Sequence, residues 1–183
     1  MDLIELIEEK RFIGQEFLTW LWWKSEERGG SVALDGYGDI LVALEKHVLL
    51  ESGEGESAER LICSGLQAEL KEARTGLALG KKLEQARILI THGAYEYNFT
   101  LTGSTMDFRS VRLPKTAAAE DKPDSRAEEL EGVMLERISL FETLVRLVHE
   151  LFRIFLKSRV GDGWPEEAGK IRAWIGQTAR QLA

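Results

Sequence analysis

One long run of residues, 128–158, carries two apolar stripes and constrains the fold more than any other part of the chain. The first stripe repeats at intervals of four and three residues, which predicts an α-helix: Met134, Ile138, Phe141, Val145, Val148, Phe152 and Phe155. A second stripe lies beside it: Leu140, Leu144, Leu147, Leu151 and Ile154. Together they are too wide for a two-stranded seam. We therefore expect a long helix that is buried on two sides.

The middle of the chain alternates in the manner of a half-buried antiparallel sheet. Apolar and polar residues alternate over 95–101, and strands over 87–91 and 109–113 are expected on either side of it. Shorter strands are expected at 31–35, 39–44 and 60–63, and helices at 1–28 and 66–79. This order predicts an α+β fold, in which an antiparallel sheet with a packed helix is flanked by an N-terminal helix and a long C-terminal helical arm.

A segment without bulky apolar residues, 115–127, separates the sheet region from the long helix. It contains Pro123 and reads as a flexible linker. We accordingly expect an α+β domain over 1–114 and a helical arm over 128–183 that packs on this domain or on a partner.

Composition excludes several classes of protein. Hydrophobic residues make up 44% of the chain and charged residues 30%, as in globular proteins with a packed core. No apolar run is long enough to span a membrane, and the first residues are acidic where a signal peptide is basic, so a cytoplasmic location is expected. A single cysteine, Cys63, excludes an internal disulfide and a cysteine zinc cluster. The scattered His47, His92 and His149 predict no metal site.

No catalytic signature is present. The glycines of 76–82 are too closely spaced for a phosphate-binding loop, and no Ser or Thr follows the lysine. Cys63 has no histidine beside it in sequence, and no pair of acids stands out among the 31 in the chain. We therefore expect a protein that is not an enzyme and needs no cofactor.

Charge is unevenly distributed although the net charge is −7. Residues 1–59 carry 5 bases and 14 acids, residues 60–115 carry 9 and 5, and residues 116–183 carry 10 and 12. A locally basic surface can attract phosphate because salt screens distant charges. The candidate DNA-binding residues are Lys71, Arg74, Lys81, Lys82, Arg87, Arg109 and Arg112. On an unbulged strand, Arg109 and Arg112 would point to opposite faces, so not all seven could join one patch.

Three tryptophans, Trp20, Trp22 and Trp23, fall within four positions of the expected N-terminal helix. They point in three directions, so we expect at least one of them near a surface or an interface. Packing in the core accounts for most such residues. If single-stranded DNA is bound, Trp22 and Trp23 are the candidates for stacking on bases.

Several segments together resemble the recombination-associated protein RdgC family. They are the helix at 66–70, Gly80-Lys81, the strand at 88–90, the strand at 97–101, Phe108 and residues 111–113, together with the N-terminal run 12–23. The resemblance implies a dimeric, non-enzymatic protein of the nucleoid that binds DNA with little sequence preference and restrains recombination. Lys81 is the residue that the resemblance carries over most directly. Because the chain is shorter than familiar members and acidic, we expect weak, non-specific and salt-dependent binding.

A different class of function stays open. The wide apolar face of residues 134–155 predicts a protein-interaction or scaffold module that forms a homodimer through this helix and binds no nucleic acid. Charged residues at Val145 and Phe152 would dissociate such a dimer.

Overall fold

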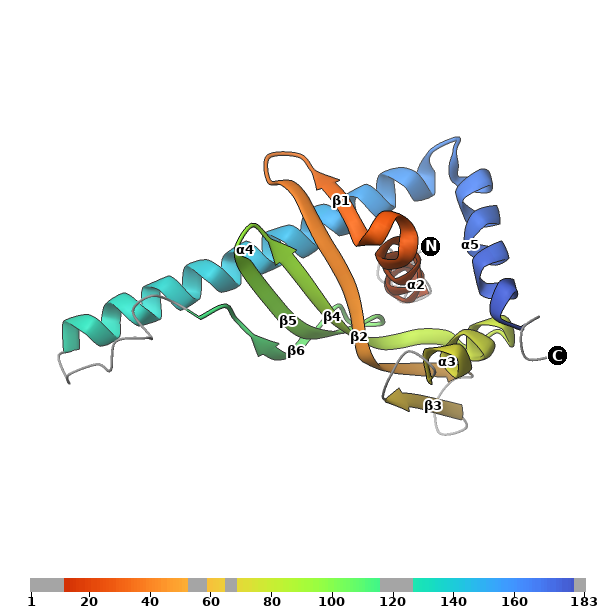
Figure 1. Cartoon of the computed structure of the whole chain (residues 1–183), viewed down its shortest axis with the longest axis horizontal. Helices are drawn as coiled ribbons and strands as arrows, with labels where there is room; N and C mark the ends of the chain where they lie inside the picture. Colours follow the sequence, from red (N-terminus) through yellow and green to blue (C-terminus); the bar gives the residue numbers. More distant parts are fainter. Residues whose placement is uncertain (1–11, 53–58, 65–68, 116–126, 180–183) are drawn as a thin grey trace, which may run out of the picture.

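The computed structural model of the chain describes residues 12–52, 59–64, 69–115 and 127–179. It confirms the α+β fold, with an antiparallel sheet, an N-terminal helix and a long C-terminal helix (Figure 1). The start of the N-terminal helix at 1–11 and the linker residues 116–126 lie outside the described residues.

The six-stranded sheet is built around β2 (Gly38–Ser52). One edge of β2 pairs with the short strands β1 (Ser31–Leu34) and β3 (Glu59–Ser64), and its other edge pairs with β4 (Lys82–His92). β5 (Tyr95–Thr102) and β6 (Phe108–Arg112) follow, with every pairing antiparallel. β4 begins earlier than the expected residue 87, because Leu83 and Ala86 extend its buried row.

The helices gather on one side of the sheet, which we call the inner face (Figure 1). On this face the strands present alternate buried side chains, such as Ile88 and Ile90 of β4 and Phe99 of β5. α3 (Glu69–Ala78) lies over the β2–β3 end of this face, where Gly76 approaches the side chains of Leu50 and Leu61. The opposite side of the sheet, the outer face, carries no described helix.

The N-terminal helix α2 (Phe12–Glu26) lies at the centre of the core. Trp20, Trp22 and Trp23 retain only 1%, 1% and 8% of their exposure, so all three pack in the core, as most such residues do, and none is exposed at the surface of the chain. The reason is that α2 is covered from several directions, by the sheet, by α4 (Ala127–Val160) and by α5 (Trp164–Ala179).

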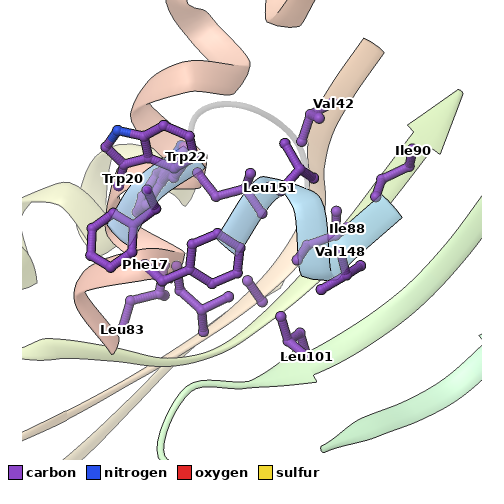
Figure 2. Close-up of a cluster of buried hydrophobic side chains, with 14 of the residues drawn as sticks. Phe17, Trp20, Trp22, Val42, Leu83, Ile88, Ile90, Leu101, Val148 and Leu151 are labelled. Carbon is purple, nitrogen blue, oxygen red and sulfur yellow. The ribbon is translucent and has the colours of Figure 1, made fainter. Parts of the chain in front are cut away.

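Side chains from α2, α4 and the sheet converge in Figure 2. Phe17 packs 5.6 Å from the ring of Phe155 in α4. A short 3-10 turn, η1 (Glu27–Gly30), connects α2 to β1.

The start of α2 is fixed to the sheet by a close backbone approach. A Cβ atom on Gly14 would lie 1.9 Å from the carbonyl oxygen of Gly103, so only glycine fits there. Glu84, the extra residue at a bulge between β2 and β4, is 8% exposed and accepts hydrogen bonds from Gln15 Nε2 at 2.7 Å and from Ser104 Oγ. These contacts supply the buried carboxylate with donors.

The long helix is buried on two sides only in its C-terminal half. Its second stripe is buried, as expected, from Leu140 to Leu151. The first stripe joins the core only from Val148 onward, and the expectation of two buried sides is wrong for the N-terminal half. There the helix extends beyond the sheet (Figure 1). Six large apolar side chains on this half are between 38% and 63% exposed: Leu130, Met134, Leu135, Ile138, Phe141 and Val145.

Candidate nucleic-acid interface

The outer face of the sheet gathers polar and basic side chains in rows that cross the strands. In an antiparallel sheet, residues directly opposite one another project to the same face. Arg87 of β4 lies opposite Thr100 of β5, which in turn lies opposite Arg109 of β6. In the next row, Asn98 of β5 lies opposite Arg112 of β6. The edge formed by β4, β5 and β6 therefore carries three arginines on one face.

A β-bulge in β6 places Arg109 and Arg112 on the same side. Ser110, between them, has a φ of 50°, and the register of the β5–β6 pair shifts at this point. The extra residue restores the outward direction of Arg112, while Val111 packs toward the core. The expectation that the two arginines point to opposite faces applied to an unbulged strand, and the bulge means that this condition is not met. We call Arg87, Arg109 and Arg112 the outer arginine cluster.

The members of this cluster differ in how far they are already paired. Arg87 donates to Asn98 Oδ1 at 2.8 Å and lies 3.2 Å from the Glu45 carboxylate, and its side chain is 26% exposed. Arg109 and Arg112 are exposed, and neither forms an ion pair with a residue that the structure describes. These two guanidinium groups are therefore the ones best placed to meet an external anion.

The structure places the other basic candidates elsewhere. Lys81 is 17% exposed, and its ammonium group lies 2.8 Å from Glu59 and 3.2 Å from the hydroxyl of Ser52. The hydrogen bond from Lys81, and then its charge, hold the pKa of Glu59 below the ordinary value. Lys82 is exposed at the start of β4, opposite Glu51 of β2.

Arg74 of α3 is held at the helical side of the molecule. Its guanidinium group pairs with Glu26 and lies 4.9 Å from the ring of Trp174 and 5.7 Å from that of Trp22. This arrangement packs α3 against α2 and α5. Lys71 belongs to α3, but its side chain lies outside the described part of the structure. The six candidates whose side chains are described thus lie in three places, and only Arg87, Arg109 and Arg112 share one face.

The tryptophans proposed for base stacking are covered. Trp22 packs edge-to-face on Trp174 at 5.3 Å and donates its Nε1–H to Glu26, and Lys24 lies 4.4 Å from the ring of Trp23. Stacking a base on either ring would require the core to open, so Trp22 and Trp23 are not accessible to DNA bases in this structure.

Three further observations bear on other functions. Within the described ranges, no group of three or more histidine, cysteine, aspartate or glutamate residues is arranged to hold a metal ion. None of the helices in those ranges has both the length and the apolar character needed to cross a membrane. Cys63 is buried in β3.

Sequence reasoning found the three arginines but missed their common face. A signal for it was present: the apolar residues Phe108, Val111 and Leu113 are spaced by three and then by two, which breaks strict alternation and indicates a bulge. In comparisons with known proteins, the sequence matches no protein family and no curated protein.

Proposed function

We propose that the chain is a non-enzymatic protein that binds DNA without sequence preference, in the manner of the RdgC family that it resembles, and acts at the nucleoid in the control of recombination. The observation that supports DNA binding is the outer arginine cluster on a sheet face that no described helix covers. Guanidinium groups pair well with phosphate oxygens because their planar fork of donors matches the geometry of the anion.

The chemistry of this face favours contact with the DNA backbone. Asn98 and Thr100 stand among the arginines and can donate to phosphate oxygens as well. With Trp22 and Trp23 buried, the face gains nothing from stacking, so the affinity comes mainly from charge and falls with salt. The net charge of −7 opposes the approach of DNA, and we expect binding to be weak and strongest at low ionic strength.

The proposal is tested by fluorescence anisotropy with labelled random-sequence duplex and single-stranded DNA, at about 20 to 200 mM salt. The variant reverses both exposed charges, Arg109→Glu with Arg112→Glu. We expect it to lose at least about tenfold in low-salt affinity and to reduce the salt slope by roughly 2, one for each lost phosphate contact.

A matched control reverses the same number of charges elsewhere. Lys157 in α4 and Arg172 in α5 are exposed, and Lys157→Glu with Arg172→Glu gives the same net charge. A control that weakens binding as much as the arginine pair would show that net charge alone matters and that the outer face has no special role. An absence of wild-type binding at the lowest salt would remove the proposal and leave the scaffold alternative.

A further inference from the structure

The N-terminal half of α4 carries an apolar face that the described structure leaves largely exposed; Phe141 alone has a ring contact with the sheet, 6.2 Å from Phe108 of β6. Met134, Ile138, Phe141 and Val145 follow one another at intervals of four, three and four residues, which is the a/d spacing of a coiled coil. With Leu130 and Leu135, these side chains expose roughly 500 Å² of apolar surface, a size at which such patches mark interaction sites. We propose that this face binds the same face of a second copy of the chain, as a short parallel two-stranded coiled coil.

The residues at the a positions support a two-stranded assembly. Ile138 and Val145 take the a positions, while Met134 and Phe141 take the d positions. β-Branched side chains at a, combined with leucine at d, favour parallel dimers over higher oligomers, and the a positions of this stripe follow that rule. Two copies would bury about 1,000 Å² of apolar surface together, which reaches the lower limit of specific interfaces.

Charge complementarity determines the orientation. In a parallel pair, the residue at a g position meets the residue five places further along the partner helix, at an e position. This rule pairs Arg137 with Glu142 of the second copy, and Leu130 with Leu135 of the second copy. Arg137 forms no ion pair within the part of the chain that the structure describes, and Glu142 makes only a 3.8 Å contact with the exposed Arg146. In an antiparallel pair e positions face e positions, so Glu142 would meet either Leu135 or Glu142 of the second copy.

The rest of α4 leaves room for this partner. The second stripe, which includes Leu140 and Leu144, already faces the core of its own chain. The exposed stripe is displaced from it by one residue, or about 100° around the helix, so one helix can serve both contacts. Phe152 lies 5.1 Å from the ring of Phe17 and belongs to the core of its own chain, so a charge there would unfold the protein rather than test the dimer.

Sedimentation equilibrium of the full chain, at concentrations up to about 100 µM, tests the association. We expect a dimer for the wild type and a monomer for Ile138→Glu, whereas Ser139→Glu, on the neighbouring exposed position, should remain a dimer. Because Ile138 is 52% exposed, its variant should keep the wild-type circular dichroism spectrum. A monomeric wild type, including one in which another segment of the same chain covers the stripe, would overturn the proposal.

Cysteine cross-linking tests the orientation. In a Cys63→Ala background, Met134→Cys should form a disulfide-linked dimer on mild oxidation, because equivalent d positions adjoin only in a parallel, in-register pair. Ser139→Cys, which points away from the partner, should not. In addition, Arg137→Glu should weaken the dimer at least about threefold, and Arg137→Glu with Glu142→Arg should restore it. The parallel register would be ruled out if Met134→Cys formed no cross-linked dimer. It would also be ruled out if Arg137→Glu with Glu142→Arg did not restore the affinity lost in Arg137→Glu.

Discussion

Two glutamates allow bulky indole rings to be buried together with their polar N–H groups. Glu26 accepts hydrogen bonds from Trp22 Nε1 at 3.1 Å and from Trp174 Nε1 at 2.9 Å. Glu167 accepts from Trp20 Nε1 at 3.1 Å and from the hydroxyl of Ser158, and it lies 3.4 Å from Lys24. A buried N–H without an acceptor destabilises the fold, so these carboxylates allow the indole rings to be buried without that penalty.

Glu167 should make the stability of the protein sensitive to acid. Burial alone would raise the pKa of Glu167, but hydrogen bonds from Ser158 and Trp20 and the charge of Lys24 together lower it. A carboxyl with a lowered folded-state pKa stabilises the fold above its unfolded pKa of about 4.3, and this contribution is lost as pH falls through the folded value. We expect Glu167→Gln to cost about 1–2 kcal/mol at pH 7 and to approach wild-type stability in acid, measured by urea unfolding between pH 7 and pH 3.

The neighbouring Glu166 provides the control for this measurement. Its pKa is also lowered, by the hydrogen bond and then the charge of Lys170, but its side chain is 77% exposed. Glu166→Gln should therefore leave unfolding at pH 7 unchanged within error. Equal losses for the two variants would contradict the role assigned to the buried carboxylate.

At the scale of elements, regular patterns were predictable and irregular ones were not. The alternation of β5 and the start of α5 at residue 164, with proline and two acids in the first turn, follow from local chemistry. The exposure of the N-terminal half of α4 could not be predicted in this way. An apolar stripe indicates that a helix packs against a partner, but it does not indicate whether the partner belongs to the same chain. The burial of all three tryptophans of residues 20–23 depends on long-range packing that spacing alone does not encode.

The bulge in β6 is the element on which the outer arginine cluster depends. Ser110 has a positive φ, which a β-branched residue adopts at a cost of about 1–2 kcal/mol and glycine adopts freely. Serine already bears part of this cost, so we expect Ser110→Val to destabilise the protein by up to about 1 kcal/mol. The variant should also weaken DNA binding, since loss of the bulge would turn Arg112 away from the outer face.

Ser110→Gly is the matched variant, and it should keep the bulge, gain up to about 1 kcal/mol and bind DNA like the wild type. Thermal unfolding and anisotropy measure the two properties separately. If Ser110→Val were as stable as Ser110→Gly, the strain attributed to this position would be wrong.

At the scale of the whole molecule, the two proposed surfaces are separate, and this makes their coupling measurable. The outer arginine cluster belongs to β4 and β6, and the exposed stripe belongs to the N-terminal half of α4, which extends beyond the sheet in Figure 1. A dimer would present two clusters to one DNA, and the second contact would form at a high effective concentration. We expect Ile138→Glu to weaken binding to a long duplex at least about tenfold, with little effect on a duplex too short for both copies. An equal loss on both lengths would indicate that the variant disturbs the DNA-binding face itself.

The central position of α2 affects how the protein folds during its synthesis. Two hydrogen bonds join α2 to α5, which is synthesised much later: Trp20 with Glu167, and Glu26 with Trp174, pairs separated by 147 and 148 residues. Until α5 has been synthesised, the indole groups of α2 lack these acceptors and part of their apolar cover. During that interval the nascent chain must keep this strongly hydrophobic segment out of aggregates, as is typical of folds dominated by distant contacts.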